Sequence, residues 1–285
     1  MATVRSRGAR IRSNVFAYAN LAPYVFFVMF PFYFMAVTSF KSNAELYNLK
    51  SIPFWIQSGV IIDHYALLFQ KTEFVTWMKN SLLVAVVATS VSLVISILAG
   101  YSLARLRFRG AGSFGTAIFI TYLVPPTLLF LPLSQVVVWL GLADSITALM
   151  VIYPTFLVPF CTWLLMGYFR TIPREVEECA LVDGATRMQT LSKIVLPMAL
   201  PGIICAVLFS FTLCWNEFIY ALTFISQSGN KTAVVGVTSD LIRGDIYFWG
   251  SLMAGALLAS IPIVIIYVLF LDYYVSGLTA GAVKG

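Results

Sequence analysis

The sequence predicts an all-α membrane protein with six transmembrane helices. Of its 285 residues, 60% are apolar and only 11% are charged, which is too little polar surface for a soluble domain of this size. Six apolar stretches are each long enough to cross roughly 30 Å of hydrocarbon at about 1.5 Å per helical residue. None of them alternates with a period of two, so the pattern favours helices over a transmembrane barrel.

The predicted spans contain several prolines, which kink helices and release carbonyl groups that neighbouring helices or water must satisfy. The fifth span is overlong, and Pro197 and Pro201 near its start indicate that part of it bends or lies outside the hydrocarbon. The six spans cover residues 20–40, 79–104, 114–137, 146–168, 194–224 and 248–271.

Positive charges predict that both termini lie in the cytoplasm. Four arginines precede the first span, three fill the link between the second and third, and four basic residues flank or occupy the link between the fourth and fifth. The opposite links carry their basic residues on longer loops, which bias orientation less. Trp77, Trp139 and Trp249 then fall at outer helix ends as an aromatic belt, and we expect His64 to be exposed in the outer loop.

These arguments divide the chain into regions along its length. We expect a cytoplasmic N-terminal segment, the first helix at 20–40, an outer loop, a membrane core with a cytoplasmic helical segment inside it, and a cytoplasmic tail. Apart from the first helix, the ranges are 1–19, 41–78, 79–272 with the segment at 171–190, and 273–285.

Several chemistries are disfavoured by the residue types. The chain has one histidine and four cysteines without a C-x-x-C pair, so a metal site or a disulfide framework is not expected. The net charge of +6 is explained by topology rather than by nucleic-acid binding. A G-x-x-x-x-G-K-[ST] phosphate loop is missing, so ATP hydrolysis in this chain is not expected, and we predict no cofactor for it.

Residues 171–190, which we call the docking segment, are unusually polar for a link between spans. Eight charges lie between Arg170 and Lys193, which favours contact with something in the aqueous phase. Pro173 marks a helix start, Gly184 is placed to end that helix in a left-handed conformation, and Thr186 to Gln189 matches a capping box that starts a second helix.

Helical periodicity predicts which residues of the first short helix share a side. It places Val176, Cys179, Ala180 and Asp183 together, and Glu175 and Glu178 elsewhere. An amphipathic helix lying in the lipid headgroups is the alternative, but such helices use Trp, Phe and Lys rather than small residues and acids.

The docking segment resembles the "EAA" motif of ABC importer permeases. The matching order is Glu178-x-Ala180, three residues, Gly184, nine residues, then Ile194-x-Leu196-Pro197, with Cys179 in place of the usual first alanine. Further motifs resemble the carbohydrate subgroup, specifically the maltose-transporter-like inner-membrane subunit, and extend the likeness from the second span to the chain end. They are Asn80-Ser81, Gly100 to Arg105, Asp183 to Thr186, Trp215 to Phe218, and Gly277 to Gly285.

The resemblance implies a type I ABC importer permease fold in the bacterial cytoplasmic (inner) membrane, with the docking segment as a coupling helix on a cytoplasmic ATPase. Glu178 would then pair with a basic side chain of the ATPase, Cys179 and Ala180 would allow close approach, and Gly184 would make the turn. Asp183 belongs to the same set of coupling residues. The plainer interpretation is that Gly184 only caps a helix and Glu178 is a solvated acid. The tail would also reach the ATPase, although glycine-rich ends often fray.

The same resemblance implies several partners. They are a homologous second permease subunit, two ATPase subunits that bind ATP and Mg²⁺, and a periplasmic or lipid-anchored solute-binding protein. The chain itself would be a non-catalytic subunit that couples ATP hydrolysis to alternating access for a sugar-like substrate.

Candidate residues for the substrate path lie in the outer half of the fifth span. Asn216 and Glu217 stand beside Trp215 and Tyr220, and an amide, an acid and aromatic rings suit the hydroxyls and faces of a sugar. Tyr122 in the third span is a weaker candidate. A hydrogen bond that packs helices together, or a gate, would explain the same residues.

Two rival functions remain open at the sequence level. One is an importer of the same architecture for a polyamine, phosphate or other non-sugar solute. The other is a secondary transporter driven by an ion gradient, which usually carries carboxylates or broken helices near the bilayer midplane. The second rival leaves the docking segment without a role.

Overall fold

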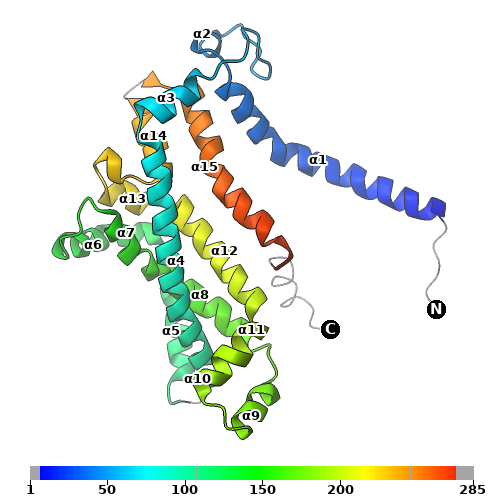
Figure 1. Ribbon diagram of the computed structural model, residues 1–285, viewed down its shortest axis with the longest axis vertical. Helices are drawn as coiled ribbons and strands as arrows, with labels where there is room; N and C mark the ends of the chain where they lie inside the picture. Colours follow the sequence, from blue (N-terminus) through cyan, green and yellow to red (C-terminus); the bar gives the residue numbers. More distant parts are fainter. Residues whose placement is uncertain (1–6, 107, 244–245, 274–285) are drawn as a thin grey trace. The chain divides into compact units, whose positions relative to one another are not determined.

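The computed structural model describes residues 7–106, 108–243 and 246–273, so the predicted tail motif at 277–285 lies outside the described residues. The chain divides into two compact units. Figure 1 labels their helices along the chain. The first unit comprises Met1–Thr72 with Leu241–Leu258, and the second comprises Glu73–Asp240 with Ala259–Gly285.

The first unit is built around helix α1 and the outer loop. Its elements are α1 (Arg7–Ser39), α2 (Asn43–Leu46), α3 (Asp63–Lys71), the antiparallel strands β1 (Ile242–Arg243) and β2 (Ile246–Tyr247), and the start of α15 (Trp249–Leu269). His64 on α3 is buried rather than exposed as predicted, because its ring bonds the Lys41 carbonyl at 2.9 Å and Ser251 Oγ at 3.2 Å.

A buried carboxylate organises the outer loop. Glu45 on α2 accepts hydrogen bonds from the backbone N–H of Gln57 at 3.0 Å and of Ser58 at 2.9 Å, and it pairs with Lys41 at 3.3 Å. Lys41 also donates to the carbonyls of Ile52 and Pro53 at 2.6 and 3.1 Å. These bonds join residues 41–45 to residues 52–58 of the outer loop.

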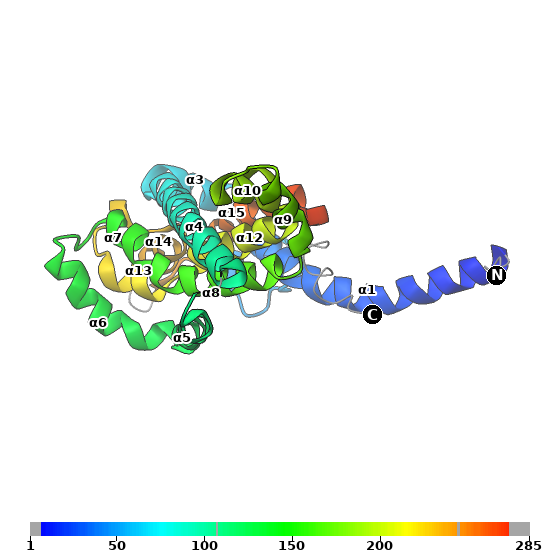
Figure 2. The same cartoon turned by 90° about the horizontal axis from the view of Figure 1, so that it is seen from below.

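The second unit contains the remaining helices, and α4 is its longest. Helix α4 packs most extensively along α8 and then along α12, and Figure 2 shows these helices from below. The elements are α4 (Phe74–Arg105), α5 (Ala111–Leu123), α6 (Pro126–Trp139), α7 (Ile146–Ile152), α8 (Pro154–Phe169), α9 (Arg174–Val182), α10 (Arg187–Thr190), a π-helix (Leu191–Val195), α11 (Leu196–Met198), α12 (Leu200–Asn216), α13 (Ile219–Phe224), a 3-10 turn (Ser228–Asn230), α14 (Ala233–Asp240) and the end of α15.

Four helices are long and apolar enough to cross a membrane, and two bent helix pairs raise the number of candidate spans to six. The four single spans are Asn14–Ser39, Phe74–Arg105, Ile146–Phe169 and Trp249–Leu269. The fifth predicted span bends by 78° between α11 and α12, at Pro197 and Pro201, which confirms the bend inferred from these prolines.

The third predicted span differs from the expected single kinked helix. Helices α5 and α6 meet at 95°, so the segment is a broken span or a re-entrant loop. Val124 and Pro125 are extended, with ψ of 120° and 127°, because a residue that precedes proline is excluded from the helical region. The double proline therefore ends one helix and begins the next.

Trp77 was predicted in an interfacial belt, and that prediction is wrong. Its side chain is fully buried, its Nε1–H donates to the Ser228 carbonyl at 2.8 Å, and Gly236 leaves room for the ring. Trp139 at the end of α6 and Trp249 at the start of α15 are exposed, and their place in an interfacial belt stays a prediction. The neighbouring Asn80-Ser81 motif also holds the segment before α14, because Ser81 Oγ accepts the Ala233 N–H at 2.8 Å.

Candidate functional site

The docking segment folds as the local sequence signals predict. Helix α9 starts after Pro173 and ends in a Schellman motif, where Gly184 has φ of +86° and its N–H donates to the Leu181 carbonyl at 3.1 Å. The Ala185 N–H donates to the Ala180 carbonyl at 2.9 Å and completes the motif. A residue with a Cβ rarely adopts this backbone conformation, which explains the glycine at position 184.

A capping box starts the second helix directly after this turn. The Gln189 N–H donates to Thr186 Oγ1 at 3.3 Å, and the Thr186 N–H donates to Gln189 Oε1 at 2.8 Å. Helix α10 continues through the π-helix and α11 towards α12, so the docking segment is joined by continuous helical backbone to the fifth predicted span.

The inner side of α9 carries a buried ion pair that sequence reasoning missed. Glu177 lies 2.6 Å from Arg105 Nε, and both side chains are at most 5% exposed. Tyr101 donates its hydroxyl to Glu177 Oε2 at 3.1 Å. Arg105 also donates to the Ile172 carbonyl at 2.7 Å, so the last turn of α4 holds both the start and the middle of the docking segment.

The outer side of α9 remains open to solvent. Glu178, Cys179, Asp183 and Gly184 are all exposed. The predicted side of the helix needs correction, because Ala180 is buried with Glu177 and so does not share an outward face with Cys179 and Asp183. The buried ion pair sets this orientation.

Large apolar side chains stand on the surface of the docking segment as well. Val182 is 88% exposed and Met188 is 61% exposed. A neighbouring cavity of about 490 Å³ is lined by Arg174, Glu178 and Arg187 among others. The segment therefore presents apolar and charged groups next to one another, which is a composition suited to contact with another protein.

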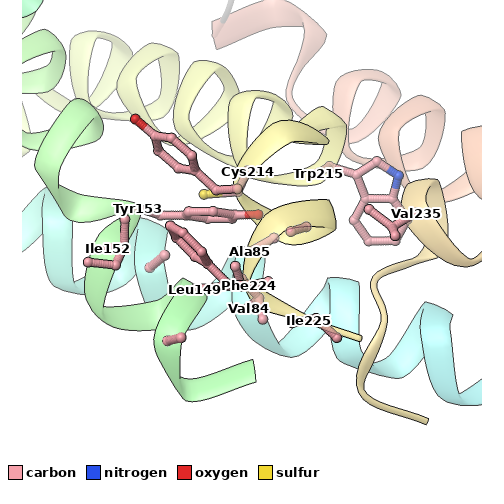
Figure 3. Close-up of a cluster of buried hydrophobic side chains, with 14 of the residues drawn as sticks. Val84, Ala85, Leu149, Ile152, Tyr153, Cys214, Trp215, Phe224, Ile225 and Val235 are labelled. Atoms are coloured by element: carbon pink, nitrogen blue, oxygen red, sulfur yellow. The ribbon is translucent and has the colours of Figure 1, made fainter. Parts of the chain in front are cut away.

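The residues predicted for the substrate path separate into two groups. Trp215 and Tyr220 are 2% and 1% exposed, and both belong to the buried cluster of the second unit. Figure 3 shows part of this cluster, with Trp215 near Val235. Trp215 Nε1–H donates to the Ala259 carbonyl at 3.0 Å, and the Tyr220 hydroxyl donates to the Pro126 carbonyl at 2.8 Å. Their polar atoms are thus used inside the protein.

Glu217 has a role in the chain's own folding. Helix α12 ends at Asn216, and Glu217 accepts hydrogen bonds from the N–H groups of Tyr220 at 2.8 Å and Ala221 at 3.0 Å, which caps α13. The Tyr153 hydroxyl donates to the same carboxylate at 2.8 Å. Glu217 was predicted within a continuous span, and the structure places it at a helix break instead.

Asn216 and Tyr122 are the two predicted path residues that stay exposed. The Asn216 side chain donates to the Thr212 carbonyl at 3.0 Å, which leaves its amide oxygen available. Tyr122 is 43% exposed, and its ring centroid lies 5.5 Å from that of Phe160.

Comparisons with known proteins agree with this architecture. Residues 92–279 match the family described as "Binding-protein-dependent transport system inner membrane component". The chain is 36% identical to the inner membrane ABC transporter permease protein YcjP of Escherichia coli, over 97% of this chain and 98% of that protein. It is 33% identical to the diacetylchitobiose uptake system permease protein DasC of Streptomyces coelicolor, over 93% and 96% of the two chains.

A solved structure shares the fold at low sequence identity. It is a bacterial ABC transporter involved in the import of the acidic polysaccharide alginate, with a TM-score of 0.76, 22% identity, and coverage of 96% of this chain and 100% of that one. The family match covers most of the chain and includes the whole docking segment. This protein therefore belongs to the family of binding-protein-dependent transport system inner membrane components and is a permease subunit of an ABC transporter.

Proposed function

We propose that this chain is a permease subunit of an importer for a sugar or sugar-like solute in the bacterial cytoplasmic membrane. The relative from Streptomyces coelicolor is a permease for diacetylchitobiose uptake and shares 33% identity over nearly the whole chain, which supports a carbohydrate substrate. The apolar helices and the inner-membrane description of the family support the location.

The docking segment is proposed to be the contact with a separate ATPase. One observation carries this proposal: α9 is held on its inner side by the Arg105–Glu177 ion pair, while Glu178 and the Gly184 turn remain exposed on the outside. A helix fixed in this way moves as a rigid body with the end of α4. Glu178 is then free to pair with a basic side chain of the ATPase and to set the register of docking.

The remaining subunits complete the proposed mechanism. ATP and Mg²⁺ bind to two ATPase subunits, whose closure moves the docking segments of this chain and of a second, homologous permease. The spans then open outward towards a solute-binding protein, and release of the hydrolysis products resets them. In this scheme the chain carries no catalytic residue. Asn216 and Tyr122 are proposed to line the substrate path, and Glu217 positions the helix break that directly follows Asn216.

Reversal of the exposed docking charge tests the coupling role. Glu178→Lys should lower ATP-driven uptake by the reconstituted complex on the order of tenfold or more, because a like charge replaces the partner of a basic group at an interface. Gly184→Pro should do the same, because proline requires a negative φ and the turn has φ of +86°. The measurements are the rate of ATP-driven uptake and the amount of ATPase subunit that copurifies with the permease.

A matched charge reversal controls for general electrostatic effects. Glu73→Lys changes another exposed acid, just before α4, and should leave uptake near the wild-type rate. Wild-type uptake by Glu178→Lys, with the protein present in the membrane at the normal level, would show that the docking segment does not couple through this residue.

A further inference from the structure

A cavity of about 750 Å³ lies in the second unit, where α4 and α8 end and α5 and α9 begin. It is lined by the last turn of α4, the link into α5, the first residue of α5, the residue that follows α8, and the start of α9. We call it the arginine cavity, because Arg105, Arg109, Arg170 and Arg174 line it. It adjoins the smaller cavity beside the docking segment and shares Arg105 and Arg174 with it.

The arginine cavity has an excess of positive charge. Its lining contains no acidic residue, whereas Glu177 and Glu178 line the smaller cavity. Arg105 is already paired with Glu177. Within residues 7–106, 108–243 and 246–273, the guanidinium groups of Arg109, Arg170 and Arg174 form no ion pair or hydrogen bond, and all three residues are exposed. Arg174 also lines the smaller cavity beside Glu177 and Glu178, whereas Arg109 and Arg170 line only the arginine cavity. An excess of cations around one hollow favours an anion.

Apolar side chains line the same cavity. Leu106 and Phe108 are 37% and 43% exposed, and Leu103 and Ala104 complete an apolar wall. The cavity lies at the ends of spans, where hydrocarbon gives way to headgroups. A phospholipid can place its phosphate against the arginines and its acyl chains against the apolar side chains of the cavity. A free hydrated anion can interact with the arginines alone. Arginine also binds phosphate through two parallel hydrogen bonds.

We propose that the arginine cavity binds the phosphate headgroup of an anionic phospholipid, with its acyl chains along the apolar wall. The positive-charge bias places this end of the spans in the cytoplasmic leaflet, and basic pockets between transmembrane helices on that side suit anionic headgroups. A bound headgroup would bridge α4, α5 and the start of α9, and so would stabilise the support on which the docking segment rests.

Lipid retention by the purified full-length transporter complex tests the proposal. Native mass spectrometry measures retained lipid after addition of phosphatidylglycerol or of phosphatidylcholine. Each of Arg109→Gln, Arg170→Gln and Arg174→Gln should weaken phosphatidylglycerol binding about fivefold, and the triple variant should abolish the preference over phosphatidylcholine. Arg→Lys at the same three positions keeps the charge but loses the paired hydrogen bonds, so it should weaken phosphatidylglycerol binding less than Arg→Gln does and leave a preference over phosphatidylcholine. Lys50→Gln, Lys71→Gln and Lys79→Gln together remove three exposed charges from the opposite links and should have no effect.

Three outcomes would overturn the proposal. The first is a triple Arg→Gln variant that retains phosphatidylglycerol as well as the wild type does. The second is displacement of the lipid by millimolar inorganic phosphate, which would identify a soluble anion as the ligand. The third is loss of the ATPase subunit from the triple variant with lipid binding intact, which would identify a protein surface as the occupant.

Discussion

At the scale of single residues, the buried pair Arg105–Glu177 is the contact that decides how the docking segment is presented. Taking two charges out of water is costly, and their attraction offsets that cost only while both partners are present. Glu177 receives a second bond from Tyr101, and Arg105 makes a second bond to the Ile172 carbonyl. The pair therefore specifies one orientation of α9 and leaves Glu178 outside.

Removal of both partners of this pair should cost less stability than the sum of the two single removals. Arg105→Ala and Glu177→Ala should each lower the free energy of unfolding by about 3 to 5 kcal/mol, because each leaves an uncompensated buried charge. The double variant should lose less than the sum of the two, measured by detergent-titration unfolding of the purified protein. Lys193→Ala removes an exposed charge near the same segment and should cost less than about 0.5 kcal/mol. Strict additivity of the two losses would contradict the pairing.

Glu45 gives the outer loop a dependence on pH. Burial raises the pKa of this carboxyl, but hydrogen bonds from Ser58 and Gln57 and the bond from Lys41 outweigh burial and lower the pKa to about 2, from an ordinary value of 4.5. Since the folded state favours the ionised form, the stabilisation is complete above about pH 4.5 and is lost as the pH falls towards 2.

This sign predicts the behaviour of Glu45→Gln, which cannot ionise. The difference in free energy of unfolding between the wild type and Glu45→Gln should be constant above about pH 4.5 and should shrink as the pH is lowered from there. Fluorescence of Trp55 in the same loop reports the local unfolding. Ser58→Ala should reduce the difference, because it removes one of the bonds that lower the pKa. A difference that grew on acidification would contradict the assignment.

At the scale of elements, prolines and glycines decide where helices break and how closely they approach. The double proline at 125–126 separates α5 from α6, and Pro197 and Pro201 accompany the bend before α12. Glycines allow close packing at two places in the second unit. Gly202 on α12 lies against the ring of Tyr168 on α8, and Gly236 on α14 lies against Trp77 on α4.

Gly202→Ala should loosen the packing of α12 on α8. A Cβ at this position would lie 2.5 Å from the Tyr168 ring, so the ring or the helix must shift. We expect a loss of about 1 to 3 kcal/mol in the free energy of unfolding, measured by the same detergent titration. Gly167→Ala on α8 is the matched control, because nothing lies within 4 Å of its added Cβ, and it should be neutral or slightly stabilising. Equal losses of stability in both variants would show that the close contact with Tyr168 is not the cause of the loss in Gly202→Ala.

At the scale of the whole molecule, the chain is one subunit of a larger machine. A docking segment held rigidly on one side and exposed on the other needs a partner to serve transport. The energy source is therefore expected to be ATP bound elsewhere, and not an ion gradient across the spans.

Reconstituted vesicles separate these energy sources. Uptake of a labelled oligosaccharide, chosen from a panel of sugars presented on the cognate binding protein, should continue with ATP after ionophores collapse the ion gradients. It should stop when ATP is omitted. Uptake that required the gradients would favour the secondary transporter, and transport of an amine or anion alone would replace the sugar assignment.

Much of the fold and part of the candidate site could be predicted from sequence. The apolar segments, the left-handed turn at Gly184 and the capping box at Thr186 depend on residues close in the chain, and each is present in the structure. The side of α9 that faces inward could not be predicted, since Tyr101 and Glu177 are separated by 76 positions in sequence. Trp215 and Tyr220 fit a sugar site by residue type, but their burial depends on packing across several helices.

By itself, the sequence determined the apolar segments long enough to cross a membrane, the caps at Gly184 and Thr186, and a motif that resembles the one in ABC importer permeases, because composition, caps and spacing are local properties. Only the tertiary structure decided that Glu177 turns inward and Glu178 outward, that Trp77 and His64 are buried, and that Glu217 caps a helix. The burial of Glu177, Trp77 and His64 depends on distant groups that satisfy a charge or hydrogen bond, and no short stretch of sequence contains both partners. The partners of Glu217 are close in sequence, but the helix break that lets its carboxylate reach them is not marked by a local signal.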